Sequence, residues 1–70
     1  MAESVYKFIE IAGSSTESWE KAAVAAVETA ASSLNDLRVA EVLEQDMTIE
    51  NGKVSAYRIK LKVSFKYHTD

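Results

Sequence analysis

The sequence predicts an α+β fold in which a three-stranded antiparallel sheet wraps around one helix, in the chain order β-α-β-β. The first observation is residues 56–65, AYRIKLKVSF, where apolar and polar side chains alternate as in a strand with one buried face. The second is Asn51-Gly52 between two alternating runs, which is typical of a hairpin with a type I′ turn. The third is helical periodicity over residues 16–34, following a short apolar strand.

The first strand is expected at Val5–Ala12, where apolar side chains fall on both faces, as in a strand that is covered on both sides. Gly13-Ser14-Ser15 is expected to end it. A helix is then predicted from Thr16 to Leu34, with Ser15 as the N-cap and an acidic first turn that suits the helix dipole. Its apolar stripe, which we expect to pack against the sheet, consists of Trp19, Ala23, Ala26, Val27, Ala30 and Leu34.

The second half of the chain is predicted to form one long hairpin. A two-residue loop at Asn51-Gly52 sets the register, in which Val42 faces Leu61, Ala40 faces Val63, Glu41 faces Lys62, Gln45 faces Arg58 and Ile49 faces Val54. A bulge near the turn would instead shift these pairs by one residue and exchange the two faces. In the predicted register, Leu61 and Val63 pack under the helix.

The face of the sheet away from the helix, called the outer face below, is predicted to be unusual. With the last strand between the other two, all neighbouring strands are antiparallel and the helix covers only one face. The outer face then carries apolar side chains beside Arg58, Lys60 and Lys62. Lys62 is expected to pair with Glu41, and Lys60 with a carboxylate elsewhere. An apolar patch rimmed with charge indicates a subunit interface or a ligand groove; the alternative is a solvated charged face.

The size and composition indicate association with other copies of the chain. The 70 residues are predicted to form one domain, 1–70, and a chain this short buries only about 60% of its unfolded surface. It has no cysteine for a disulfide or a thiolate metal site. Since a lone core of this size barely offsets the conformational entropy of ordering the chain, oligomerisation is expected.

Several classes of function are not expected. No apolar run approaches the ~20 residues that span a membrane, and no signal segment opens the chain, so a cytoplasmic protein without a membrane partner is predicted. A net charge of -3 argues against nucleic acid as a partner. The only histidine, His68, is near the C-terminus and has no serine and aspartate partners, so an enzyme is not expected.

Segments in order along almost the whole chain match a known pattern. They are Val5-Tyr6-Lys7 with Ile9-Glu10-Ile11, Gly13-Ser14-Ser15, Ser18-Trp19-Glu20-Lys21-Ala22, Ala40-Glu41-Val42, Asn51-Gly52-Lys53-Val54, and Tyr57-Arg58 with Val63-Ser64-Phe65. With these motifs the chain resembles the dodecin family. The resemblance implies the β-α-β-β fold and a hollow homo-dodecamer of cubic symmetry. It also implies binding of a flavin (FMN or riboflavin) between the sheets of neighbouring subunits, for storage or sequestration without catalysis.

Two positions depart from the family pattern. Val39 stands where the resemblance places a tryptophan that stacks on the flavin ring, and Arg58 stands where it places a flavin-contacting glutamine. An aromatic ring offers stacking that valine lacks, and an amide both donates and accepts whereas a guanidinium only donates. We therefore take Val39 and Arg58 as candidate flavin residues, with Gln45 opposite Arg58 as a substitute amide. The alternative is a dodecin-like cage without flavin, which binds cations or another anionic ligand.

Cation sites are predicted at two carboxylates. The resemblance implies ions on the symmetry axes and at the channels of the cage, and Glu17 and Glu44 match acidic residues at such sites. Three symmetry copies of one carboxylate form an oxygen-rich site suited to Mg²⁺ or Ca²⁺. The alternative is that both are ordinary solvated glutamates.

Overall fold

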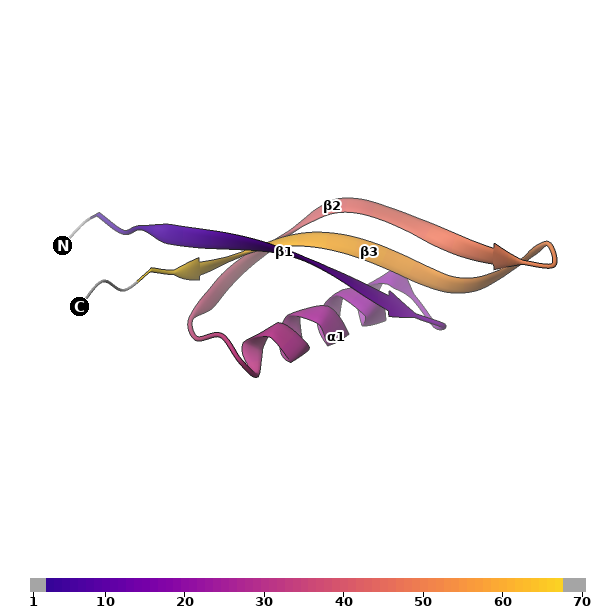
Figure 1. Ribbon diagram of the computed structural model, residues 1–70, viewed down its shortest axis with the longest axis horizontal. Coiled ribbons are helices and arrows are strands. Elements are labelled where there is room, and N and C mark those ends of the chain that lie inside the picture. The colour runs from indigo at the N-terminus through magenta and orange to yellow at the C-terminus, as the bar shows by residue number, and fades with distance from the viewer. Residues whose placement is uncertain (1–2, 68–70) are drawn as a thin grey trace.

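A computed structural model describes residues 3–67 of the protein, and its elements follow the expected order. They are β1 (Tyr6–Ser15), α1 (Trp19–Ala31), β2 (Leu37–Glu50) and β3 (Lys53–Lys66). β3 lies between β1 and β2, and both pairings are antiparallel. α1 lies against one face of the sheet, which extends past both ends of the helix (Figure 1). The predicted α+β fold is confirmed. Within residues 3–67, no helix is long and apolar enough to cross a membrane.

β1 continues three residues beyond the predicted end at Ala12, so the expectation that Gly13-Ser14-Ser15 breaks the strand was wrong. Gly13 pairs with Ile59 of β3 in the middle of the sheet. It serves to bring the helix close, because a Cβ built at Gly13 would lie 2.4 Å from the carbonyl oxygen of Ala22 and 3.0 Å from the Cβ of Ala26. A glycine inside a strand often marks such a close backbone approach.

The helix begins later than predicted, at Trp19, and its N-cap is Ser18 rather than Ser15. The Oγ of Ser18 accepts a 3.0 Å hydrogen bond from the backbone N–H of Lys21, which satisfies one of the free donors of the first turn. Ser15 has another role: its Oγ accepts from the backbone N–H groups of Glu17, at 2.9 Å, and Ser18, at 3.4 Å. These bonds turn the chain from β1 into α1.

The helix ends at Ala31, before the predicted end at Leu34. Ser32 Oγ donates to the carbonyl oxygen of Thr29 at 2.6 Å. The backbone N–H groups of Ser32 and Ser33 also donate to carbonyls of the last helical turn. Because these bonds satisfy carbonyls that would otherwise be free, the helix terminates without needing a glycine.

The core is small and lies between α1 and the middle of β3. Its buried members are Ala22, Ile59, Leu61 and Val63, and the partly buried apolar residues packed against it are Ile9, Ile11, Trp19, Ala23, Ala26, Val27 and Leu37. The prediction that Leu61 and Val63 lie under the helix is confirmed. Ala22 was missing from the predicted stripe, although it is fully buried. It lies against Gly13, and this contact between a helix and a strand cannot be seen from the periodicity of the helix alone.

The hairpin turn has positive φ at both Asn51 (54°) and Gly52 (76°), as a type I′ turn requires. Four of the predicted pairs are confirmed: Val42 with Leu61, Ala40 with Val63, Glu41 with Lys62 and Ile49 with Val54.

The predicted pairing of Gln45 with Arg58 was wrong, because the register shifts by one residue between two bulges, at Thr48/Ile49 and at Val42/Glu44. Asp46 pairs with Arg58 instead, and Gln45 pairs with Ile59. Each bulge adds one unpaired residue to one strand, Ser55 to β3 and Leu43 to β2, so the two shifts cancel and the predicted register holds again from Val42 to Val39. A third shift lies between Val39 and Leu37.

The close contact at Gly13 predicts a large loss of stability on adding one methyl group. Gly13→Ala should lower the free energy of unfolding by about 3 kcal/mol, since the new Cβ overlaps a backbone carbonyl that cannot move without displacing α1. Denaturant unfolding at one fixed protein concentration measures this, with Ser14→Ala, the neighbouring exposed residue, as the control. An equal, small effect of both substitutions would mean that the helix does not lie this close to β1.

Candidate functional site

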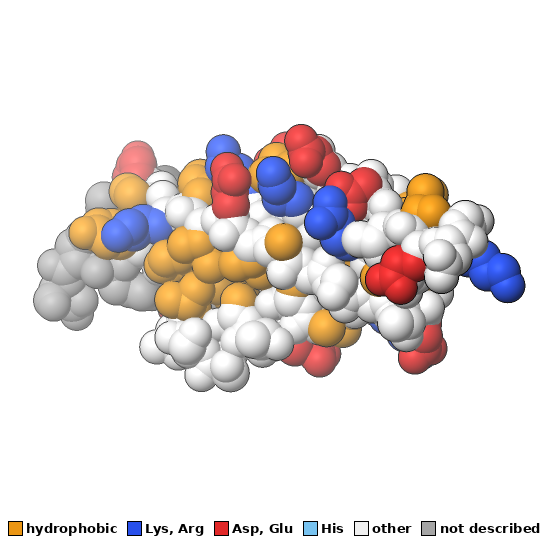
Figure 2. Space-filling model, turned by 45° about the vertical axis from the view of Figure 1, so that its right-hand side comes forward, with side chains coloured by type: hydrophobic (Ala, Val, Ile, Leu, Met, Phe, Trp, Pro, Cys, Tyr) orange, Lys and Arg blue, Asp and Glu red, His pale blue; other side chains and the backbone are white. Residues whose placement is uncertain are grey.

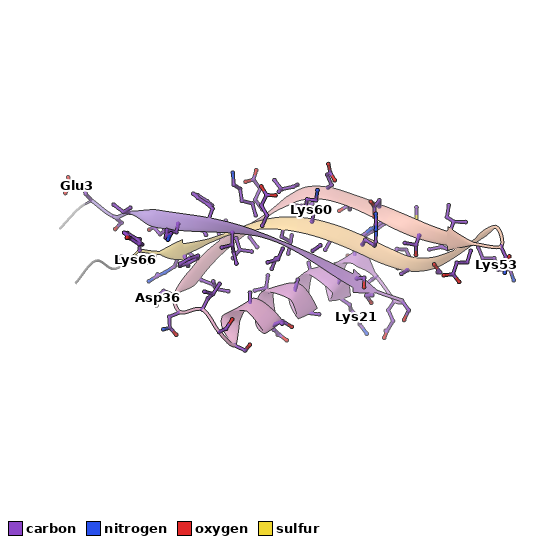
Figure 3. The ribbon with its side chains drawn as sticks, in the orientation of Figure 1. Glu3, Lys21, Asp36, Lys53, Lys60 and Lys66 are labelled. Carbon is purple, nitrogen blue, oxygen red and sulfur yellow. The ribbon has the colours of Figure 1, made fainter. Side chains whose placement is uncertain are left out.

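The outer face carries three cations of β3 in a row, and each lies between residues of the two flanking strands. Arg58 pairs with Ser14 and Asp46, Lys60 with Ala12 and Glu44, and Lys62 with Glu10 and Glu41. Acidic and basic side chains gather together along the upper side of the molecule in Figure 2, above the helix layer. Lys60 lies in the middle of this row (Figure 3). The outer face therefore carries alternating charges rather than a purely basic strip.

The strongest of these interactions joins Arg58 to Asp46. The Nε and Nη2 atoms of Arg58 donate to the two carboxylate oxygens of Asp46, each at 2.7 Å. These hydrogen bonds hold the pKa of Asp46 below its ordinary value of 3.8, although desolvation opposes them, and the same bonds raise the pKa of Arg58. The two side chains remain about half exposed, at 55% and 51%. One edge of the guanidinium is thus occupied from within the chain.

Trp19 supports this ion pair from the other side of the sheet. Its Nε1 donates a 3.0 Å hydrogen bond to the backbone carbonyl of Asp46. Its ring meets that of Tyr57 edge to face, with centroids 5.1 Å apart and an interplanar angle of 71°. The expectation that Trp19 packs in the core is confirmed, but its hydrogen bond to β2 was not predicted. The start of α1 is thereby tied to Asp46 on β2 and to Tyr57 on β3, the residue before Arg58.

The two remaining cations, Lys60 and Lys62, have different kinds of partner. The Nζ of Lys60 lies 3.5 Å from Oε1 of Glu44, which confirms that Lys60 reaches a carboxylate. The Nζ of Lys62 lies 5.3 Å from the centroid of the Phe8 ring, a cation–π arrangement. Although Lys62 and Glu41 are paired in the sheet, no ion pair joins them among residues 3–67. The prediction of a Lys62–Glu41 ion pair was therefore wrong, because the ammonium group of Lys62 lies over an aromatic ring of β1 instead.

An open groove of about 320 Å³ crosses the outer face beside Arg58. It is lined by Ala12, Gly13, Ser14, Glu44, Asp46, Arg58, Ile59 and Lys60. The β1 side of the groove has only small side chains, while its other walls supply two cations and two carboxylates. The groove has both polar and apolar walls, and its formal charges cancel.

The structure brings only two of the three predicted flavin residues onto the outer face. Val39 is 64% exposed and pairs with Ser64, which lies between it and Phe8 of β1. Arg58 lies in the groove described above. Gln45, in contrast, lines a hollow on the helix side together with Trp19 and neighbouring residues. The register shift accounts for this, because it exchanges the faces that Gln45 and Asp46 occupy.

The predicted metal-binding carboxylates lie apart in the chain and each has a lysine partner. Glu17 precedes α1, and its Oε1 lies 2.6 Å from Nζ of Lys21; Glu44 belongs to β2 and pairs with Lys60. Within the described part of one chain, no three histidine, cysteine or acidic residues cluster to hold a metal ion. His68 lies outside the described residues. One chain by itself therefore lacks a complete cation site among residues 3–67.

Comparison with known proteins identifies the family. Residues 5–68 match the family model Dodecin. The chain belongs to the dodecin family. It is 56% identical over 63 residues to the calcium dodecin of Mycobacterium tuberculosis, and the match covers 90% of this chain and 89% of that protein. The resemblance inferred from the sequence motifs is thus confirmed over almost the whole chain.

Solved dodecin structures share the fold in detail. A single-residue variant of the dodecin of T. thermophilus has a TM-score of 0.89 at 36% identity, covering 96% of this chain and 100% of that one. The dodecin of Streptomyces coelicolor gives 0.85 at 30% identity, with complete coverage of both chains. A crystal structure described as a calcium-chelating calcium dodecin from M. tuberculosis, with a novel calcium-binding site, gives 0.81 at 54% identity and covers 96% of each chain.

The ion pair on the outer face of this dodecin predicts a specific pH dependence of stability. Because Arg58 lowers the pKa of folded Asp46, the contribution of the pair is complete above pH 3.8, the ordinary value, and is lost as pH falls through the lower folded value. The difference in unfolding free energy between the parent and Asp46→Asn should therefore be constant near neutral pH and shrink in strong acid. Denaturant unfolding of both proteins across this range measures the difference.

Glu41→Gln is the matched control, since it removes the same charge from the same strand without breaking the Arg58–Asp46 pair. If the difference in unfolding free energy between the parent and Glu41→Gln also shrank in strong acid, the effect would be a general result of lost charge.

Proposed function

We propose that this protein is a calcium-binding dodecin whose cation sites form between subunits of a homo-dodecamer. The observation that carries the proposal is its 56% identity, over 90% of the chain, to a protein named calcium dodecin. The related crystal structure described as calcium-chelating, at 54% identity, gives further support. The role we infer is binding and sequestration in the cytoplasm rather than catalysis.

Assembly would bring together oxygen ligands for Ca²⁺ from several chains. Ca²⁺ takes six to eight oxygen ligands, whereas no three potential ligands cluster within residues 3–67 of a single chain. Around a threefold axis, three copies of one carboxylate would supply up to six oxygens. Glu17 and Glu44 suit this role because their side chains are 65% and 69% exposed and each is held only by a flexible lysine. Such numerous, adaptable oxygen ligands favour Ca²⁺ over Mg²⁺, which demands strict octahedral geometry.

The exposed apolar surface supports association of many copies. Large apolar side chains that are at least one-third exposed include Val5, Tyr6, Phe8, Val24, Val39, Val42, Leu43, Met47, Ile49 and Val54. Exposure on this scale in a 70-residue chain is typical of an interaction surface. Burial between subunits would stabilise a core that is otherwise formed by four buried apolar residues.

Calcium binding should depend on carboxylates that are shared between subunits. Calcium titrated into the metal-free protein should bind with a stoichiometry of roughly one ion per three subunits for each kind of threefold site. Glu17→Gln and Glu44→Gln should each remove one kind of site, as measured by isothermal titration calorimetry. Glu28→Gln, an exposed glutamate of α1, is the control and should bind as the parent does.

Sedimentation should first establish a particle near twelve times the 7.7 kDa chain mass for every variant. If the intact parent particle did not bind calcium, the proposal would be overturned. Binding that survives both substitutions would instead assign the ligands to other residues.

Flavin binding is the second candidate function, and the exposed apolar pair Val39 and Phe8 favours it. Both residues flank Ser64 on the outer face, at 64% and 57% exposure, and together they offer an apolar surface to a flat ring. The surface lacks an aromatic side chain on β2, so we infer that flavin binds weakly. Arg58, with one edge held by Asp46, has only its remaining donors for the ring.

An indole at position 39 should therefore increase flavin affinity. Val39→Trp should bind riboflavin at least about 3- to 10-fold more tightly than the parent, because stacked aromatic rings add attraction beyond buried area. Quenching of flavin fluorescence measures both affinities. Val39→Leu, which adds apolar area without a ring, is the control. Equal affinities for Val39→Trp and Val39→Leu would mean that residue 39 does not contact the flavin ring.

A further inference from the structure

The outer-face groove contains two cations whose arrangement would suit an anion, but a carboxylate of the chain already holds one of them. Arg58 and Lys60 are two residues apart on β3 and both line the groove. Their opposite wall consists of Ala12, Gly13 and Ser14, which leave room for a ligand. A guanidinium and an ammonium side by side are the groups that proteins use to bind phosphate. In this chain, however, Asp46 accepts two 2.7 Å hydrogen bonds from Arg58.

Asp46 is held in place by the fold. The two bulges of the hairpin move it directly opposite Arg58, a position that regular pairing would have assigned to Gln45. Its backbone carbonyl accepts the 3.0 Å hydrogen bond from Trp19 Nε1. A carboxylate positioned in this way acts at a high effective concentration, so a dissolved anion at micromolar concentration competes poorly for the same donors. The ion pair of Lys60 is longer, with its Nζ 3.5 Å from Oε1 of Glu44.

We propose that Asp46 is a selectivity residue that occupies Arg58 and so makes the outer-face groove reject phosphate-bearing ligands. The groove then accepts uncharged or cationic ligands, since its two carboxylates balance its two cations. Removing the charge of Asp46 exposes an anion site formed by Arg58 and Lys60. The inference concerns the groove alone and does not depend on calcium binding.

Pyrophosphate is the probe, because it carries the phosphate charge without a ring that stacks elsewhere. It is titrated by calorimetry into the whole protein, at fixed ionic strength in calcium-free buffer. Asp46→Asn should bind pyrophosphate at least about tenfold more tightly than the parent, as expected when a charge-assisted bidentate contact becomes available. Asparagine keeps the backbone bond to Trp19, so the strand position should persist. Glu41→Gln is the control for charge, since it neutralises an outer-face carboxylate outside the groove.

The double variant Asp46→Asn with Arg58→Gln removes the pair without leaving either charge alone, and it should bind pyrophosphate no more tightly than the parent. An equal gain in Asp46→Asn and Glu41→Gln would overturn the proposal, because the effect would then be one of net charge. So would a parent that binds pyrophosphate more tightly than the double variant, since Arg58 would then be available despite Asp46. The second comparison can still overturn the proposal if Asp46→Asn alone does not fold.

Discussion

The close approach of α1 to β1, where Gly13 lies against the carbonyl of Ala22, is the contact on which the rest of the structure depends. It lets a helix with a stripe of alanines lie flat on the sheet and bury Leu61 and Val63 almost completely. The helix has 13 residues and is about 20 Å long, whereas the two hairpin strands have 14 residues each and run about 46 Å. One helix therefore covers less than half the length of the sheet. The rest of the sheet, and the whole outer face, depends on other molecules for burial.

The charges of the outer face fit this one-sided arrangement. Arg58 and Lys60 each have a carboxylate partner on β2, and Lys62 lies over the ring of Phe8. On an exposed surface such pairs contribute little to stability, because water and salt screen them. Between subunits they would lose water, and each cation would then need the partner that it already has. An outer face that is partly apolar and whose three central cations each have a partner is thus suited to burial in an assembly, which agrees with membership of the dodecin family.

The Arg58–Asp46 pair also changes how the departures from the flavin-binding pattern are interpreted. From the sequence alone, Arg58 is a donor that replaces a glutamine. In the structure it belongs to a network that runs from Trp19 through the backbone of Asp46 to the guanidinium. The substitution is therefore one part of a rearranged segment, in which the bulges, Asp46 and Trp19 act together.

The sequence by itself determined the order of the elements, the hairpin turn and the family. Alternation in 56–65 and the Asn51-Gly52 pair are local signals, and local backbone preferences set both a strand face and a type I′ turn. The turn placed Ile49 opposite Val54 correctly, because register propagates from the loop, whereas the predicted pairing of Val42 with Leu61 holds because the two bulges between that pair and the turn cancel. Motifs in matching order and spacing along almost the whole chain carried the family resemblance.

Only the tertiary structure decided which residues meet in the groove. Two bulges that cancel leave the predicted register unchanged both at Ile49–Val54 near the turn and at Val42–Leu61 under the helix, so neither the turn nor the core pairs reveal that Asp46 has taken the place of Gln45. The role of Gly13 was hidden for the same kind of reason, since a strand glycine resembles a strand end until the helix that packs on it is known. Each of these features arises from contact between different helices and strands, and no pattern within one element encodes it.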